Sequence, residues 1–360
     1  MKYAIIHAGK DLLRDQIEKD LKDELKSRGF MIGHLDGEIN FILNFTQFDK
    51  LSAVHRRRQN EFVVSIALLQ KETDDLKYLC YNSLVQTLSN LFICVKSDGE
   101  SVSEVYCITP EVGFYKIEYS VPGLVDLMLP VITAHFAINN RIRYDLPAKY
   151  TTTKITEELK YYGTVLNNLG VLPAPFPLHE VLSQENINHV YKIFNVSGLS
   201  YGNLSARERI EEVGENTFWM TARGVDKGQL KGVGKDILLV EGFDEKEGKI
   251  LARIPAGSNT SIRVSVDAIE HLMIYQTFAE VGAIVHVHAW MKDILCTTQN
   301  FPCGTLELAK EVVGLLKTTP NPTRAVIGLK NHGLTITGNN LGDIFSRIEG
   351  KLLKEVPMMV

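Results

Sequence analysis

Residues 283–290 read AIVHVHAW, and this stretch decides how the second half of the chain is interpreted. Its apolar residues predict a strand, in which positions i and i+2 share a face. The imidazoles of His286 and His288 then point the same way, and Val285 and Val287 face the opposite side. Two imidazole nitrogens on a rigid strand are compatible with a metal site. For this stretch alone, two hydrogen-bonded histidines near a strand end are the favoured interpretation, because the pair supplies only two ligands where zinc takes three or four.

A third histidine follows in residues 325–338, AVIGLKNHGLTITG. His332 precedes a glycine at a predicted strand–turn junction, where its side chain can face a cavity. Taken alone, it is better explained as a surface or capping histidine than as a ligand. Together with His286 and His288 it completes three nitrogen ligands, which is the ligand count of a catalytic zinc site with an open position. The sequence therefore predicts a Zn²⁺ site, or a site for another divalent ion such as Mn²⁺ or Co²⁺.

An acidic residue and a fourth histidine lie just upstream, in VSVDAIEHLMIYQTF at 264–278. Asp267 and His271 are four residues apart, which places them on one face of a predicted helix. Asp267 lies at the helix start, where a carboxylate can act as an N-terminal cap or as a catalytic group. His271 is expected to pack beneath the site rather than to bind the metal.

The composition of the 360-residue chain is that of a globular protein, with 45% hydrophobic and 23% charged residues. A net charge of −4 gives no general attraction to nucleic acid or acidic membranes, and no apolar run approaches the roughly 20 residues that span a bilayer. The five cysteines form no CxxC pair, which indicates reduced thiols. We therefore expect a cytoplasmic protein without a nucleic-acid or membrane partner.

The first half of the chain alternates predicted strands with helical segments, which favours an α/β fold. A strand at KYAIIHA and a helix at 11–29 begin this pattern, and 121–142 is predicted to be mostly helical. A helix that ends at Gly170 is followed by the proline-rich stretch VLPAPFP. These features predict a smaller α/β domain of unknown role over 1–150, a helix and linker over 151–177, and a second domain over 178–360. A Gly-Lys pair in HAGKD lacks the glycine spacing of a phosphate-binding loop.

The second half resembles the class II aldolase/adducin family, which includes L-fuculose-phosphate aldolase and L-ribulose-5-phosphate 4-epimerase. Its motifs follow one another in the family's order. They are GNLS at 202–205 with Arg207, MTARGV at 220–225, the segment from Asp267 to His271, and HVH at 286–288 with NHG at 331–333. Any one of these motifs is weak, whereas the ordered set is specific. Residues 1–150 lie outside the resemblance.

The resemblance implies a three-layer α/β/α domain, assembled as a homo-oligomer, with a metal held by His286, His288 and His332. It implies that Asp267 is the acid/base and that a sugar or sugar-phosphate substrate is bound by the residues Asn203, Ser205, Arg223, Gly224 and Ser265. Arg223 stands where sugar-phosphate members have a hydroxyl-bearing residue, and only one serine precedes Asp267. A guanidinium can compensate, because it binds phosphate or carboxylate through two parallel hydrogen bonds. It can equally indicate a substrate without a phosphate, or an arginine exposed in a turn.

The implied function is that of a metal-dependent aldehyde-lyase in carbohydrate metabolism, which cleaves a small ketose or ketose phosphate through an enediolate. Asp267 is one methylene shorter than the glutamate of the aldolases, so epimerisation or dehydration of a sugar phosphate remains an alternative. An adducin-like interaction module without catalysis is a third interpretation. The presence of three potential ligands argues against it.

Overall fold

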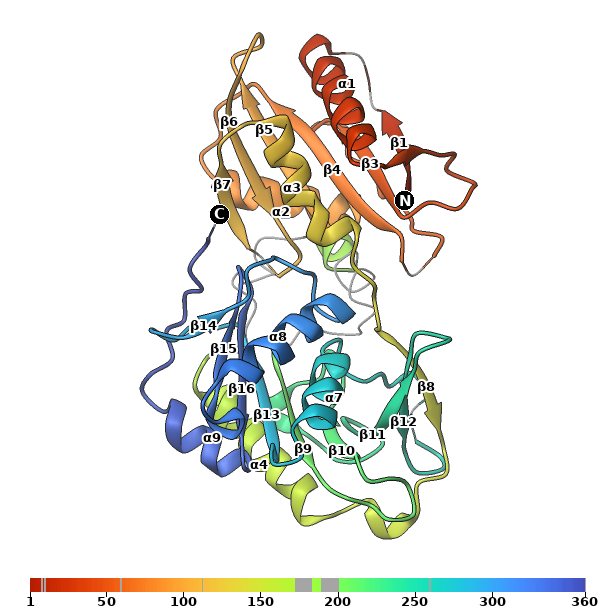
Figure 1. Ribbon diagram of the computed structural model, residues 1–360, viewed down its shortest axis with the longest axis vertical. Coiled ribbons are helices and arrows are strands. Elements are labelled where there is room, and N and C mark those ends of the chain that lie inside the picture. Colours follow the sequence, from red (N-terminus) through yellow and green to blue (C-terminus); the bar gives the residue numbers. More distant parts are fainter. Residues whose placement is uncertain are drawn as a thin grey trace. The chain divides into compact units, whose positions relative to one another are not determined.

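The computed structural model of the chain describes residues 1–7, 9, 11–58, 60–111, 113–171, 183–188, 201–258 and 260–359. These residues divide into two compact units, each built around its own β-sheet (Figure 1). The first unit includes Met1–Ala134, and the second begins at His135. Among the described residues, none of the helices combines the length and the apolar character that crossing a bilayer requires.

The first unit has a seven-stranded sheet in the order β2-β1-β3-β4-β5-β6-β7. The strands are β1 (Lys2–His7), β2 (Met31–Ile32), β3 (Phe41–Thr46), β4 (Phe62–Leu69), β5 (Leu91–Ser97), β6 (Val102–Ile108) and β7 (Phe114–Ile117). The first five pair in parallel, whereas β6 and β7 are antiparallel. All six residues of β3 are buried, as is typical of a parallel strand covered on both faces. The expected α/β class is therefore confirmed for this part of the chain.

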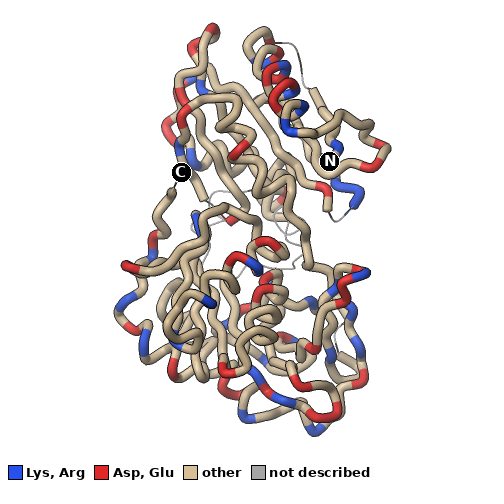
Figure 2. The backbone as a smooth tube through the Cα atoms, viewed as in Figure 1, with Lys and Arg blue, Asp and Glu red and all other residues tan. Residues whose placement is uncertain are grey.

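Three helices accompany this sheet: α1 (Leu12–Ser27), α2 (Leu76–Thr87) and α3 (Val121–Ile132). Asp11 caps α1 by accepting a hydrogen bond from the backbone N–H of Arg14. Acidic and basic residues are interspersed along this helix (Figure 2), and Glu24 and Arg28 form an i, i+4 ion pair at 2.8 Å. The helix predicted over 11–29 is thus confirmed, and it ends two residues earlier than predicted, at Ser27.

The prediction that 121–142 is mostly helical is wrong beyond Ile132. The helix ends there, and Asn139–Arg143 forms the strand β8, which pairs in parallel with β12 (Lys249–Arg253) of the second sheet. Residues 139–143 alternate between exposed and half-buried, a period of two that suits an edge strand. The apolar residues before this segment continue the helical pattern, so the change from a helical period to a period of two could not be recognised in the sequence.

The second unit has a nine-stranded sheet in the order β14-β15-β16-β13-β9-β10-β11-β12-β8. Its other strands are β9 (Asn203–Arg207), β10 (Phe218–Thr221), β11 (Ile237–Asp244), β13 (Ala283–Val287), β14 (Leu295–Cys296), β15 (Val326–Leu329) and β16 (Gly333–Gly338). The central strands pair antiparallel. Because β13 lies between β9 and β16, residues distant in sequence meet at its end.

Helices cover this sheet in two groups: α7 (Ala268–Thr277) with α8 (Leu306–Thr318), and α4 (Lys154–Asn168) with α9 (Leu341–Ile348). Residues of α7 and α8 share one hydrophobic core with Ile284 of β13. The helices α4 and α9 contact each other and pack on β9, β13 and β16 outside that core. The helices of this unit thus form two groups around the sheet, as expected for an α/β/α arrangement.

The predicted domain division at 150 and 178 stays a prediction. In the structure, β8 and α4 already contribute to the second unit, although both precede residue 178. The proline-rich part of the predicted linker, residues 172–177, lies outside the described residues.

Candidate metal centre

The strand β13 carries the first two histidines of the predicted metal site. His286 lies directly opposite Asn203 of β9 on one side and Thr335 of β16 on the other. All five residues of β13 are buried, and His286 shares its face with Ile284, which packs in the core formed with α7 and α8. His288 follows the strand end on that same face. The sheet therefore presents the imidazoles toward the layer of α7.

His332 arrives from the tight connection between β15 and β16. Asn331 adopts a left-handed backbone conformation, with a φ of 58°, which turns the chain at this point. A Cβ atom on Gly333 would lie 2.2 Å from the carbonyl oxygen of Val287, so only glycine lets the turn approach β13 this closely. This close approach brings His332 beside His288.

The three imidazoles converge. One ring nitrogen of each lies within 4.8 Å of the others. The ring centroids of His332 are 4.8 Å from those of His286 and His288, and the Nε2 atoms of His288 and His332 are 3.1 Å apart. Ligands of a tetrahedral zinc ion lie about 2.0–2.1 Å from the metal and so roughly 3.4 Å from one another. The spacing thus fits a single divalent cation.

The hydrogen bonds and protonation of the rings also fit a cation. His286 donates its Nδ1 proton to the carbonyl oxygen of Leu334 at 3.0 Å. The lone pair on Nε2 is then available to bind a metal ion. Burial, followed by the charge of His286, lowers the pKa of His332 to about 3. Burial and the two neighbouring imidazoles lower the pKa of His288 well below its ordinary value. Neutral imidazoles are the form that binds metal.

Asp267 lies beside the triad and is held by Asn203. Asn203 donates from Nδ2 to Oδ2 of Asp267 at 2.7 Å and to the hydroxyl of Ser265 at 3.1 Å. Asp267 occupies the position before α7, yet its side chain makes no capping hydrogen bond. Its charge acts on His332, where it opposes the lowering of the pKa. The carboxylate is therefore directed toward β9 and the triad rather than used as a helix cap.

Ser205 belongs to a buried network beneath the triad. Its hydroxyl is hydrogen-bonded to Nδ1 of His271 at 2.7 Å and to the hydroxyl of Tyr275 at 2.8 Å. His271 is fully buried, and burial lowers its pKa to about 3. In the described residues His271 is not part of the ligand cluster, as the sequence led us to expect. A substrate-binding role for Ser205 stays a prediction.

Arg223 is buried instead of exposed in a turn, and burial lowers its pKa to about 10. Its guanidinium donates from Nε to the carbonyl oxygen of Val264 at 3.2 Å and from Nη2 to that of Ile138 at 2.7 Å. The next residue, Gly224, has a φ of +69°, a conformation that favours glycine. Arg223 thus braces the segment that leads into Asp267. Its predicted contact with substrate stays a prediction.

Replacing Arg223 with glutamine is expected to destabilise the second unit. The shorter side chain leaves the carbonyl oxygens of Val264 and Ile138 without their charged donor, which should lower the free energy of unfolding by about 2–3 kcal/mol. Urea denaturation of the purified protein measures this difference. The variant Arg209→Gln is the control, because Arg209 is exposed and forms a surface ion pair with Glu215. Equal stability of the two variants would contradict the bracing role.

Two buried ionisable residues near Asp267 were not predicted from the sequence. Lys227 is 2% exposed, and burial lowers its pKa to about 7 although Asp267 and Asp226 oppose this shift. Glu270 is 3% exposed and accepts a hydrogen bond from the hydroxyl of Thr335 at 2.5 Å. Burial, together with the charge of Asp267, raises the pKa of Glu270 to about 8. Glu270 lies about one helical turn after Asp267. This spacing was the feature of the sequence from which its position near Asp267 could have been predicted.

In the metal-free protein, Glu270 should make stability depend on pH. Its folded-state pKa of about 8 exceeds the ordinary value of 4.5, so the native state holds this proton more tightly than the unfolded state. The stabilisation is complete below the ordinary pKa and is lost as the pH rises through the folded-state pKa. The free energy of unfolding should fall by up to about 1.4 kcal/mol per pH unit in this window.

The variant Glu270→Gln keeps a hydrogen-bond acceptor for Thr335 and removes the titrating proton. Urea denaturation in the presence of a chelator, repeated at several pH values, should show a flatter pH dependence for this variant. The variant Glu349→Gln, at an exposed position, should retain the slope of the unmodified protein. An unchanged slope in Glu270→Gln would exclude Glu270 as its source.

Comparison with known proteins places these residues in a family. Residues 187–350 match the family described as Class II Aldolase and Adducin N-terminal domain. A methylthioribulose-1-phosphate dehydratase from Leptospira interrogans serogroup Icterohaemorrhagiae serovar copenhageni is 31% identical over 109 residues, which are 30% of this chain. The match spans 40% of that relative's length.

Solved structures are also similar to this chain. An L-fuculose 1-phosphate aldolase is 20% identical with a TM-score of 0.37, over 56% of this chain and 84% of the other. An aldolase II superfamily protein from Pseudomonas syringae is 13% identical with a TM-score of 0.36, over 56% of this chain and 73% of the other. The three histidines, Asp267 and Asn203 all lie inside the segment that the family describes. The candidate site thus lies within residues 187–350, the part of the chain that matches the class II aldolase and adducin family.

Proposed function

We propose that the chain is a divalent-metal-dependent lyase that acts on a small ketose or ketose phosphate. One observation carries the proposal: three imidazoles converge next to a carboxylate that a buried amide holds in place. A structural or interaction module has no need of this combination. Zinc is the proposed ion because three histidine nitrogens are a common ligand set of catalytic zinc, and Mn²⁺ or Co²⁺ can occupy the same ligands.

His286, His288 and His332 would hold the cation. When bound, the cation supplies Lewis-acid stabilisation of the negative charge that develops on a substrate carbonyl oxygen. Because the three ligands are neutral, the cation would keep its full double charge. The hydrogen bond from His286 to Leu334 fixes the orientation of one ring, so that this ligand need not reorganise.

Asp267 would take a proton from the substrate and later return one. The hydrogen bond from Asn203 occupies Oδ2 and fixes the plane of the carboxylate, which leaves Oδ1 to accept or return a proton at the substrate. Asn203 would act as a positioning residue, because it also holds Ser265 in the segment that leads to Asp267. The charge of Asp267 also acts on the buried Lys227, where it opposes the lowering of the lysine's pKa by burial.

Carbon–carbon bond cleavage of the aldolase type is our first candidate reaction, and dehydration is the second. The similarity to a protein named methylthioribulose-1-phosphate dehydratase supports the second. Both reactions pass through negative charge on the carbon next to a carbonyl group. A base is needed in each, to take the hydroxyl proton in cleavage and the proton next to the carbonyl in dehydration, so the same residues serve either. Epimerisation, the cytoplasmic location and assembly as a homo-oligomer stay predictions.

Two measurements on the 360-residue chain test the proposal. Metal analysis after purification, and again after addition of Zn²⁺, Mn²⁺ or Co²⁺, should show about one ion per chain. Product analysis by NMR with a panel of ketoses and ketose phosphates then separates the reactions. Two smaller carbonyl products indicate aldol cleavage, and one product lighter by a water molecule indicates dehydration. A protein that takes up none of these metals would instead be a non-catalytic, adducin-like module.

A further inference from the structure

The parallel strands of the first unit end beside a cavity that the proposed lyase function does not use. From β1 the chain passes through α1 to β2 on one side of β1, whereas β3 lies on the other side. The strand order therefore reverses between β1 and β3. In open parallel sheets, ligands bind outside the carboxyl ends of the strands at such a reversal, because the connections there diverge and leave a crevice.

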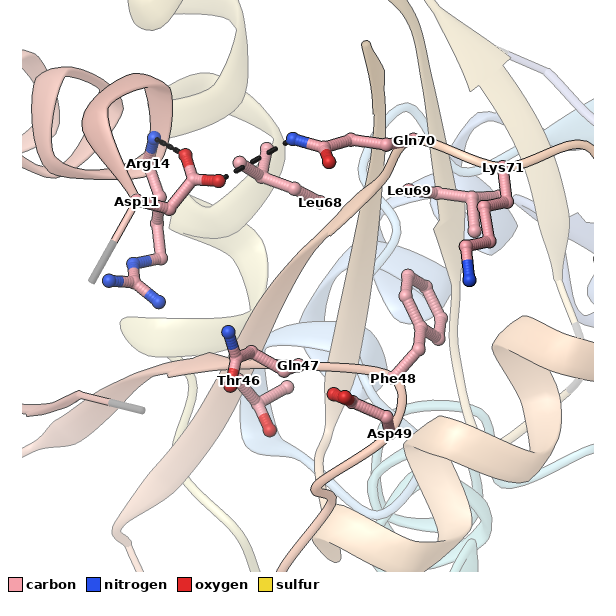
Figure 3. Close-up of a pocket in the computed structure, with 10 residues that line it drawn as sticks. All are labelled: Asp11, Arg14, Thr46, Gln47, Phe48, Asp49, Leu68, Leu69, Gln70 and Lys71. Carbon is pink, nitrogen blue, oxygen red and sulfur yellow. Dashed lines mark hydrogen bonds between the residues drawn. The ribbon is translucent and has the colours of Figure 1, made fainter. Parts of the chain in front are cut away.

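A cavity of about 260 Å³ lies at this edge of the sheet (Figure 3). Its walls come from the residues that end or follow three strands. They are Asp11 and Arg14 after β1, residues 46–49 at the end of β3, and residues 68–71 at the end of β4. The volume is slightly below the ~300–1,000 Å³ of typical small-molecule sites. It suits a mononucleotide-sized ligand better than a dinucleotide.

A buried cation forms one wall of the cavity. Arg14 is 3% exposed, and its Nη2 atom donates to the carbonyl oxygen of Gly9 at 2.7 Å and to Asp15 at 3.2 Å. Gly9 has a φ of +71°, and a Cβ atom there would lie 2.9 Å from the side chain of Gln47. Gly9 thus lies close to the side chain of Gln47 after β3, and Arg14 is anchored to the backbone of Gly9. A charged side chain held this way gives the wall a fixed geometry.

The remaining walls combine three kinds of group. Lys71 adds a second cation, and Asp11 and Asp49 add carboxylates. The ring of Phe48 also borders the cavity and packs edge-on against Phe92, with ring centroids 5.8 Å apart. Cations bind phosphate, carboxylates accept hydrogen bonds from sugar hydroxyls, and an aromatic ring stacks on a planar base. The two carboxylates would repel inorganic phosphate, so the lining favours a ligand that also offers donors.

We propose that the cavity at the β1/β3 reversal binds a nucleoside monophosphate. Arg14 and Lys71 would contact the phosphate, and Asp11 or Asp49 would accept hydrogen bonds from the ribose. The side-chain amides of Gln47 and Gln70 offer both hydrogen-bond donors and acceptors to a base. The amide nitrogen of Gln70 lies 3.5 Å from Oδ2 of Asp11 across the cavity. This makes the first unit a ligand-binding unit that is joined in one chain to the class II aldolase and adducin domain.

Isothermal titration calorimetry of the 360-residue chain with AMP, GMP, CMP and UMP tests the proposal. Saturable binding of at least one of the four is expected, with Kd raised at least about tenfold by Lys71→Gln and by Arg14→Gln, because each removes a charged contact with phosphate. The variant Lys19→Gln should bind normally, since Lys19 is exposed on α1 outside the cavity lining. Adenosine and inorganic phosphate should each bind more weakly than the nucleotide.

Two further variants keep the result interpretable. Lys71 and Asp49 are exposed, so Lys71→Gln and Asp49→Asn test the site even if Arg14→Gln does not fold. The variant His288→Ala should keep nucleotide binding, which separates this site from the metal centre. The proposal is overturned if the folded protein binds none of the four nucleotides at millimolar concentration. It is also overturned if inorganic phosphate binds equally well, if Lys71→Gln and Asp49→Asn leave Kd unchanged, or if His288→Ala removes binding.

Discussion

Replacing His288 with alanine is expected to remove the divalent metal that the three imidazoles are proposed to hold, and to abolish turnover of a ketose substrate. The variant leaves two ligands, and the 3.1 Å approach between His288 and His332 disappears. Loss of a partner that only orients a ligand reduces metal affinity or activity about 10–100-fold, so loss of a ligand itself should exceed about 100-fold. Metal content after dialysis against a weak chelator, together with initial rates at saturating metal, measures both effects.

The control for this variant is His34→Ala, which removes an exposed histidine of the first unit. It should retain the full metal content and activity. Because the imidazole lies at a strand end rather than in the apolar core, we expect His288→Ala to fold, and circular dichroism checks this. If His288→Ala retained both metal and turnover, the ligand set would be wrong, and the lyase proposal would lose its main support.

The convergence of the histidines follows from features that can be read in the sequence. Alternation in AIVHV fixes the common face of His286 and His288, and a glycine after His332 permits the tight turn that approaches β13. Neither feature shows that the turn and the strand lie side by side. That relation depends on the pairing of β13 with β16, a non-local contact that only the order of the family's motifs suggested.

Other parts of the structure left no periodic signal. The helix α2, LKYLCYNSLVQT, is buried around much of its circumference, so it lacks the polar stripe by which helices are recognised. The roles of Arg223 and Lys227 were hidden for a different reason. A charged residue in a glycine-containing turn is normally solvated, and the sequence does not reveal that tertiary packing buries these two.

Replacing Asp267 with asparagine should separate proton transfer from metal binding. Asparagine has the same shape, and its carbonyl oxygen can still accept the hydrogen bond from Asn203 that Asp267 accepts at 2.7 Å. The metal content should therefore remain, because the three imidazoles are untouched. The amide cannot take up a proton at neutral pH, so turnover should fall by about 10²-fold or more.

The size of this effect distinguishes the three roles that a carboxylate can have at this position. A helix cap would lose little on replacement by asparagine, which caps equally well, and the structure already shows no capping bond from Asp267. A metal ligand would lose the ion along with the activity. A proton-transfer group alone gives an inactive protein that keeps its metal.

The variant Asp293→Asn, at an exposed position with a φ of 56° that asparagine tolerates, should match the unmodified protein in both measurements. Full activity in Asp267→Asn would assign the proton step to another group, and the buried Glu270 and Lys227 would then be the next residues to replace.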